Sequence, residues 1–113
     1  YVRALDTAGI LRRTLGLQTD QLAALDDLAP GGDAGRLIDQ INAGYGQAAS
    51  LALVGHEPGL SRLVSMLIAG NPTIPITLKK GGACCLSADR LQYGRCSTLE
   101  WLMAPGQMEN LRA

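Results

Sequence analysis

The sequence predicts an α/β fold, and three features of its apolar pattern support this prediction. Apolar residues recur at three- and four-residue spacing in three segments, as they do on one face of an amphipathic helix. A continuous apolar run occupies residues 51–54, which suits a strand buried on both faces of a parallel sheet. Strand-forming residues dominate the last third of the chain. The expected order is helix, helix, strand, helix and then strands.

The first predicted helix covers residues 4–15. Its apolar stripe contains Ala4, Leu5, Ala8, Leu11 and Leu15, while Asp6, Arg12 and Arg13 face away from the stripe. Gly16 follows at the position where a glycine commonly ends a helix, because glycine adopts the left-handed conformation at little cost. Before the next helix, we expect a short extended piece over residues 21–28.

The second predicted helix begins after a turn. Pro, Gly and Gly at positions 30–32 are typical turn residues. Asp33 then occupies the N-cap position, where its carboxylate accepts hydrogen bonds from the backbone N–H groups of the first helical turn. The apolar stripe of this helix contains Leu37, Ile38, Ile41 and Tyr45.

The third predicted helix follows the apolar run and a short connection at residues 55–59. Pro58 fits its first turn, where the missing N–H of proline removes no hydrogen bond. The Gly-Asn-Pro sequence at positions 70–72 ends the helix. Its apolar stripe, the clearest in the sequence, contains Leu60, Leu63, Val64, Leu67 and Ile68.

The strand-forming residues in the last third of the chain predict three short strands, at residues 74–79, 82–88 and 96–103. Residues 89–94 are interpreted as a hairpin connection. In the final strand, Leu99, Trp101 and Met103 alternate with Thr98, Glu100 and Leu102. This alternation predicts that the strand has two different faces.

Length and composition limit the class of protein. With 113 residues, 47% of them apolar and 18% charged, the chain has the proportions of one globular domain covering residues 1–113. The aromatic content is low, so the core is expected from Leu, Ile, Val, Ala and the single Trp. The formal net charge of zero argues against a generally basic nucleic-acid binder. No apolar run has the length of a membrane span.

The three cysteines, Cys84, Cys85 and Cys96, do not indicate a disulfide framework, because they are odd in number and clustered. A reducing cytoplasm is therefore the expected location. Together with His56 they could be imagined as zinc ligands, but neighbouring residues on a strand point to opposite faces. We interpret the cysteines as small buried hydrophobic residues, and we expect no metal.

His56 is the first candidate functional residue. It follows the predicted strand at 51–54 and precedes the third helix, and ligands of open α/β sheets bind beyond the carboxyl ends of strands. The N-terminus of a helix favours anions. Gly55 lets the backbone turn sharply before His56, whose imidazole can donate a hydrogen bond to a phosphoryl oxygen. The alternative is a histidine that only packs at the end of the strand.

Arg3 is the second candidate. It lies beside the apolar stripe near the start of the first helix. The guanidinium offers a planar fork of donors that matches a phosphate group. An arginine in this position can equally be a solvated surface residue. A second basic feature, Lys79 with Lys80, could contact an acidic protein surface or mark a solvated strand end.

Three blocks of the sequence resemble the SixA-type phosphohistidine phosphatases, which belong to the histidine phosphatase superfamily and its phosphoglycerate mutase-like branch. The blocks are residues 3–8 (RALDTA), 28–33 (LAPGGD) and 53–61 (LVGHEPGLS). They occur in the family's order and at about its spacing. The resemblance implies a three-layer α/β/α fold, of which this chain holds the C-terminal two-thirds, without the N-terminal strand and crossover helix.

The resemblance also implies an activity and a site. Members of the family hydrolyse phosphohistidine on a phosphotransfer protein, or a small phosphorylated compound, through a phosphohistidine enzyme intermediate. Arg3 matches the family's second Arg and His56 its second His, and both would bind phosphoryl oxygens and stabilise the transition state. Gly55 and Glu57 flank His56 in the expected substrate-binding loop, and Glu57 has no assigned role. The cationic side chains make a metal or another cofactor unnecessary.

The chain departs from the family pattern in one respect. The family's nucleophile lies in an Arg-His-Gly motif at the end of the first strand, and this sequence contains no such motif. His56 is the only histidine, so the nucleophilic His is expected outside this chain, and the 113 residues alone are expected to be inactive. A sheet that lacks a central strand is also expected to self-associate or to be unstable.

The expected partners are a phosphorylated protein of the histidine-phosphotransfer type or a small phosphorylated substrate, with no nucleic acid and no membrane. Two other interpretations stay open. In one, Arg3 and His56 hold an anion in a non-catalytic phosphate-binding or interaction domain. In the other, the chain is an α/β fragment with no retained function. The sequence leaves the oligomeric state open.

Overall fold

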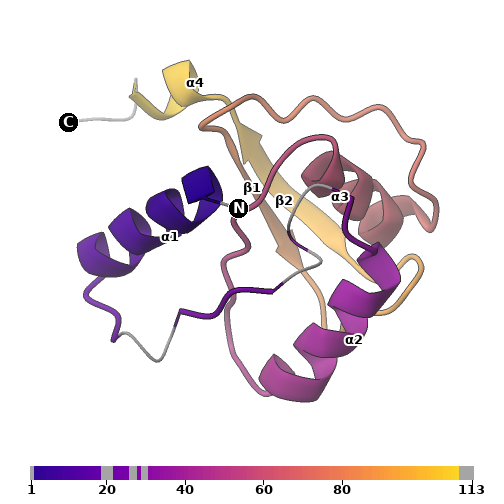
Figure 1. The fold of residues 1–113 in the computed structure, drawn as a ribbon. Coiled ribbons are helices and arrows are strands. Elements are labelled where there is room, and N and C mark those ends of the chain that lie inside the picture. The colour runs from indigo at the N-terminus through magenta and orange to yellow at the C-terminus, as the bar shows by residue number, and fades with distance from the viewer. Residues whose placement is uncertain (1, 19–21, 26–27, 29–30, 110–113) are drawn as a thin grey trace. The chain divides into compact units, whose positions relative to one another are not determined.

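The computed structural model describes residues 2–18, 22–25, 28 and 31–109, without the side chains of residues 2–4, 108 and 109. The chain divides between Gly59 and Leu60 into two compact units. Its elements, labelled in Figure 1, are α1 (Val2–Thr14), α2 (Ala34–Tyr45), α3 (Gly59–Ala69), β1 (Ala83–Ser87), β2 (Thr98–Met103) and α4 (Pro105–Glu109). The predicted mixture of helices and strands is confirmed.

Helix α1 confirms the first predicted helix, and Gly16 follows it with a φ of +69°. The predicted apolar stripe is nevertheless exposed. Leu5 is 44% exposed, Leu11 36% and Leu15 60%. None of the stripe residues whose side chains the structure describes is buried. Apolar periodicity therefore predicted the helix correctly, whereas burial of its stripe also requires a partner surface.

Helix α2 forms as predicted. The Asp33 carboxylate accepts a hydrogen bond from the backbone N–H of Arg36, with Oδ1 2.9 Å from the nitrogen, and so caps the helix. The core of the first unit comes from three residues of its predicted stripe, Leu37, Ile38 and Ile41. Tyr45, the fourth residue of the stripe, is exposed at the end of the helix.

The predicted strand at residues 51–54 is wrong. The segment is irregular, Leu51 and Ala52 are exposed, and the next two residues are half-buried. The physical reason is that a strand exists only within a ladder, where its N–H and C=O groups pair with a neighbour. No described segment supplies that neighbour. The predicted strand at 74–79 is wrong for the same reason, and residues 22–25 form no strand. The rest of the predicted extended piece includes residues outside the described ranges.

Helix α3 is the best-packed element of the second unit. It begins at Gly59, so Pro58 lies just before the first turn and not within it. Gly70, with a φ of +83°, follows the helix and donates to the carbonyl of Met66. The buried residues of α3 are Leu63, Val64, Ser65, Met66 and Leu67. Leu60 and Ile68, the ends of the predicted stripe, are half-buried.

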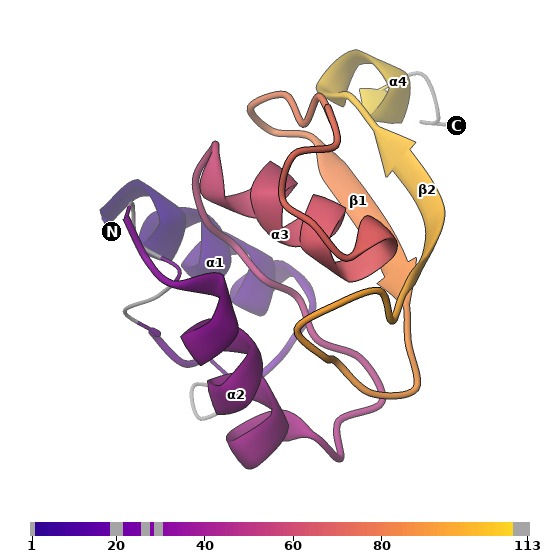
Figure 2. The ribbon, with the colours of Figure 1, turned by 90° about the vertical axis from the view of Figure 1, so that its right-hand side faces the viewer.

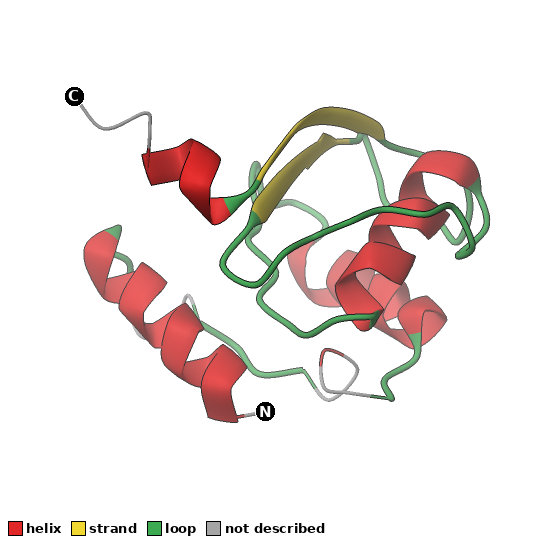
Figure 3. Cartoon of the chain, turned by 90° about the horizontal axis from the view of Figure 1, so that it is seen from above, coloured by secondary structure: helices red, strands yellow, loops and turns green. Residues whose placement is uncertain are grey.

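Strands β1 and β2 lie side by side as an antiparallel pair (Figures 2 and 3). They confirm the predicted strands at 82–88 and 96–103 and the hairpin connection between them. The pair forms a two-stranded sheet, and the described residues contain no parallel ladder. The backbone N–H groups of Cys96 and Ser97 both donate to the carbonyl of Leu67 at 2.9 Å, which ties the start of β2 to α3.

The predicted alternation along the final strand is interrupted. Cys85 pairs with Trp101 and Leu86 pairs with Leu99, so Glu100 has no partner in the register. This irregularity places Leu99 and Trp101 on opposite faces, because neighbouring residues of β1 point to opposite faces. Trp101 is 44% exposed and does not join the core, contrary to the prediction. The Ser87 hydroxyl donates to a carboxylate oxygen of Glu100 at 2.6 Å.

Gly82, which directly precedes β1, occupies a crowded position. A Cβ atom there would lie 2.8 Å from the carbonyl oxygen of Lys79 and 3.0 Å from that of Met103. Both are backbone atoms, so the chain itself must shift. We predict that Gly82→Ala lowers the free energy of unfolding by about 1–3 kcal/mol, measured by urea denaturation. Gly106→Ala is the control, because its Cβ would meet nothing within 4 Å. Equal stability of the two variants would contradict the prediction.

Candidate functional site

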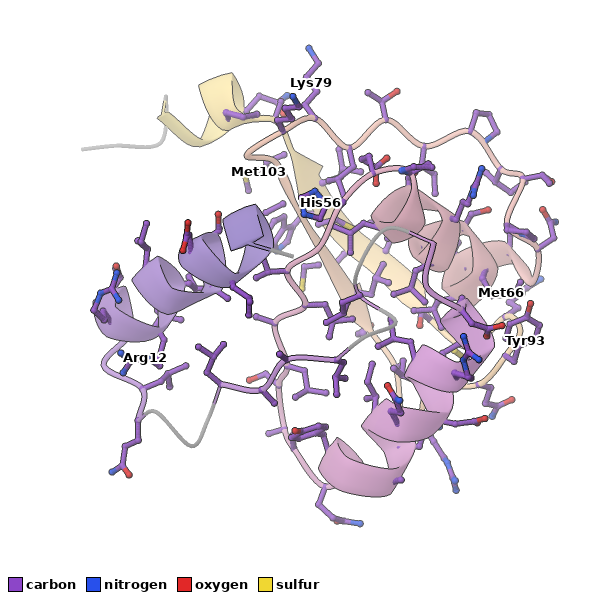
Figure 4. The ribbon with its side chains drawn as sticks, viewed as in Figure 1. Arg12, His56, Met66, Lys79, Tyr93 and Met103 are labelled. Carbon is purple, nitrogen blue, oxygen red and sulfur yellow. The ribbon has the colours of Figure 1, made fainter. Side chains whose placement is uncertain are left out.

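His56 lies on an irregular segment that ends in a turn at residues 57 and 58 (Figure 4). The residue is half-buried, and its Nε2 atom is buried from solvent. Glu57 and Pro58 are exposed, and the peptide bond between them is cis. Gly55 is half-buried and is not among the glycines with a positive φ, so the expected sharp turn comes after His56 and not before it.

The start of α3 is close to His56 along the chain. Gly59 is the third residue after His56, so their Cα atoms lie at most about 11 Å apart, since neighbouring Cα atoms are about 3.8 Å apart. The first turn of any helix leaves backbone N–H groups without intrahelical partners, and these attract anions. Chain connectivity therefore keeps the backbone of His56 within a few residues of the start of α3, and the predicted use of its N–H groups by an anion stays a prediction.

Arg3 belongs to the first turn of α1, and its side chain lies outside the described part of the structure. Residues 3 and 56 are both in the compact unit that ends at Gly59. The predicted convergence of the guanidinium and the imidazole stays a prediction. Of the four predicted site residues, Gly55, His56 and Glu57 are neighbours in the chain, and Arg3 has to reach them from α1.

Burial limits what His56 can bind in this conformation. An imidazole can donate from one ring nitrogen and accept at the other, or donate from both when protonated. The Nε2 atom is shielded from solvent, so an anion arriving from water reaches it only after the covering atoms move. Phosphate binding by His56 therefore requires a local rearrangement or the use of the other ring nitrogen.

The three cysteines are free and half-buried, so the prediction that they are buried is wrong. Cys96 makes contacts that the sequence did not reveal. Its Sγ atom accepts a hydrogen bond from the backbone N–H of Gln92 at 3.4 Å and lies 3.5 Å from the hydroxyl of Ser97. Within the described ranges, no group of three or more His, Cys, Asp or Glu side chains is arranged to hold a metal ion.

Burial raises the pKa of the Cys84 thiol, and the neighbouring Cys85 adds to this effect. A raised pKa means less thiolate at neutral pH, and the thiolate is the reactive form. We predict that iodoacetamide modifies Cys84 more slowly than it modifies glutathione at the same pH, as measured by peptide mass spectrometry over time. Modification of Cys84 as fast as glutathione would contradict this prediction.

Besides α4, two features of the second unit were not predicted from the sequence. Ser65, inside α3, is fully buried and hydrogen-bonded to the segment after the helix. Tyr93, in the connection between β1 and β2, is 67% exposed. A serine inside an apolar stripe indicates buried hydrogen bonds, because a buried hydroxyl group needs hydrogen-bond partners. The sequence around Tyr93, RLQYGR, indicates a basic loop with an aromatic residue at its tip.

Comparison of the chain with models of known protein families, with curated proteins and with solved structures found no match. Among the described residues, no helix is both long enough and apolar enough to cross a membrane. Lys79 and Lys80, the basic pair noted in the sequence, are exposed next to the turn at residues 80 and 81.

Proposed function

We propose that this chain is part of a histidine phosphatase domain of the three-layer α/β/α type and that it acts on phosphohistidine in the cytoplasm. Its substrate is a phosphorylated protein of the histidine-phosphotransfer type or a small phosphorylated compound. Arg3 and His56 bind the phosphoryl oxygens and stabilise the charge of the transition state. The nucleophilic imidazole comes from outside these 113 residues, because His56 is the only histidine present.

The observation that carries this proposal is the position of His56. The only histidine of the chain lies in the block LVGHEPGLS, and a well-packed helix begins within that block, three residues after the imidazole. A hydrogen-bond donor beside a helix N-terminus is suited to a dianionic phosphoryl group. Phosphoryl transfer needs mainly positioning and charge stabilisation, and this arrangement can provide both.

The irregular segment at 51–54 fits the same proposal. Its four residues are all apolar, yet Leu51 and Ala52 are exposed and no described strand pairs with them. We propose that the segment becomes a strand when a neighbouring strand is supplied. Such pairing would satisfy its backbone groups and would bury its apolar side chains.

Because the chain contains no histidine besides His56 that could act as a nucleophile, a function without catalysis is the second candidate. An Arg and a His can bind a phosphate without attacking it, and such a pair suffices for a non-catalytic phosphate-binding or interaction domain. The two candidates differ in turnover and not in anion binding, so an activity assay separates them.

The test compares two polypeptides on a phosphohistidine-bearing protein. One is the 113-residue chain, and the other adds an upstream segment whose strand ends in Arg-His-Gly. We expect no turnover by the first and hydrolysis by the second. His56→Ala in the longer polypeptide should lower the rate by about a hundredfold or more, the usual cost of losing a donor to transition-state charge. Arg13→Ala, on the exposed side of α1, is the matched control.

Two results would contradict the enzymatic proposal. Absence of hydrolysis by the longer polypeptide, with retained binding of phosphate analogues, would favour the binding domain. Hydrolysis by the 113-residue chain would show that the nucleophile is not missing from it.

A further inference from the structure

The loop between β1 and β2 has a surface that the proposed phosphatase function does not use. It comprises residues 89–96, here named the Tyr93 loop. Tyr93 is 67% exposed, more than any other large hydrophobic residue among those described. Burying an aromatic ring of this size is a large source of binding energy, and tyrosine is enriched in protein interfaces.

Hydrogen bonds fix the shape of the Tyr93 loop. The N–H of Gly94 donates to the carbonyl of Gln92 at 2.9 Å, which places Tyr93 at the centre of a three-residue turn. The N–H of Gln92 donates to the Sγ of Cys96 at 3.4 Å. Cys96 and the residue after it are in turn bonded to the carbonyl of Leu67 on α3. The loop is therefore anchored on a buried helix and presents Tyr93 at its tip.

Two arginines flank the tip of the loop. Arg90 and Arg95 are both exposed, and Asp89 is the only acidic residue of the Tyr93 loop. Tyrosine and arginine are enriched among the residues that contribute most to protein–protein binding. A loop that is already ordered loses less conformational entropy on binding than a flexible one. Composition and anchoring thus both suit a contact surface.

We propose that the Tyr93 loop is a docking site for an acidic segment of a partner protein. The guanidinium groups of Arg90 and Arg95 pair with Asp or Glu side chains of the partner, in the two-pronged geometry that arginine forms with carboxylates. The ring of Tyr93 packs against an apolar residue between those acids. This proposal does not depend on the phosphatase function and concerns different residues.

Charge favours a protein partner over a nucleic acid. The loop offers two arginines and one aromatic ring, and Asp89 offsets part of the positive charge. Proteins that bind nucleic acid tightly neutralise several phosphates, on the order of 6–10 of them. The chain as a whole has no net charge. A short acidic peptide needs only the two cations and the ring that the loop provides.

The test is a selection of short random peptides displayed on phage against the whole chain. We expect the enriched peptides to contain Asp or Glu beside an apolar residue. Synthetic copies should bind the chain by fluorescence anisotropy, and their affinity should fall as the salt concentration rises. Tyr93→Ala and Arg95→Ala should each weaken binding about tenfold or more. Tyr45→Ala and Arg13→Ala, exposed residues of the same types on other elements, should leave binding unchanged.

Three results would overturn the proposal. One is enrichment of peptides without an acidic bias, and another is equal binding of the enriched peptides to the Tyr93→Ala variant. The third is binding of single-stranded DNA that is tighter than that of any selected peptide and is lost in Tyr93→Ala, which would identify the loop as a nucleic-acid contact. Because the substituted side chains are exposed, each variant should keep the thermal unfolding midpoint of the parent chain, and circular dichroism checks this.

Discussion

Leu67→Ala should lower the free energy of unfolding by about 2–5 kcal/mol, the usual cost of emptying a buried leucine site. Leu67 is 3% exposed and lies near the end of α3, among the other buried residues of that helix. The substitution removes apolar side-chain contacts and leaves a cavity. It keeps the backbone carbonyl that holds Cys96 and Ser97, so those two hydrogen bonds persist. The measured decrease in the free energy of unfolding therefore reports on the packing of the core and not on the hydrogen bonds that anchor the Tyr93 loop.

Urea denaturation followed by circular dichroism measures this loss. Leu15→Ala is the matched control, because Leu15 is 60% exposed and its truncation should cost less than about 1 kcal/mol. A Leu67→Ala variant as stable as Leu15→Ala would show that α3 is not the core of the second unit.

Ser65→Ala should lower the free energy of unfolding by about 1–3 kcal/mol through the loss of two hydrogen bonds. The Oγ atom of Ser65 donates to the carbonyl of Asn71 at 2.6 Å and accepts from the N–H of Ile74 at 3.0 Å. Ser65 is fully buried, so the alanine variant leaves both backbone groups without their protein partner. The side chain of Asn71 also accepts from the N–H and the hydroxyl of Thr73, which makes this segment a connected turn.

The control for Ser65 is Ser87→Ala. Ser87 is exposed and makes its hydrogen bond to Glu100 in contact with solvent, where water can replace the lost partner. We expect a loss of less than about 1 kcal/mol for Ser87→Ala, again from urea denaturation. If the two serine variants are equally stable, the Ser65 bonds do not hold α3 to the turn that follows it.

The three longer helices were predictable because their signals are local, whereas α4 was not predicted. The stripe of Leu37, Ile38 and Ile41, with Asp33 as the cap, contains nearly all the information that α2 requires. The same holds for α3 and for the glycine that follows it. The antiparallel hairpin was also predictable, because its two strands are separated by a short turn-rich segment and do not depend on a distant partner.

The strand predicted at 51–54 could not be judged from its own residues. A run of four apolar residues has the composition of a buried strand, but only another segment can complete its hydrogen bonds. The position of Trp101 was unpredictable for a related reason. One unpaired residue, Glu100, changes which face each neighbour occupies, and the sequence alone does not reveal such an irregularity.

The candidate site was predictable in part. The sequence located His56 ahead of a helix, and the structure has that helix. The burial of Nε2 could not be predicted, because it depends on which atoms of distant residues cover the ring. The predicted partnership of Arg3 with His56 depends on contacts between α1 and the segment before α3, and no local pattern encodes those contacts.

The most direct test of the proposed site is calorimetric titration of the 113-residue chain with tungstate, a tetrahedral dianion that mimics phosphate. We predict that His56→Ala and Arg3→Ala each weaken binding about tenfold or more, and that the double variant loses less than the product of the two effects. Such coupling is expected when two side chains contact one anion. Arg13→Ala, with the same loss of charge on the same helix, should bind as the parent chain does. Tungstate binding that is unchanged in both single variants, or no binding to the parent chain, would contradict a shared phosphate site.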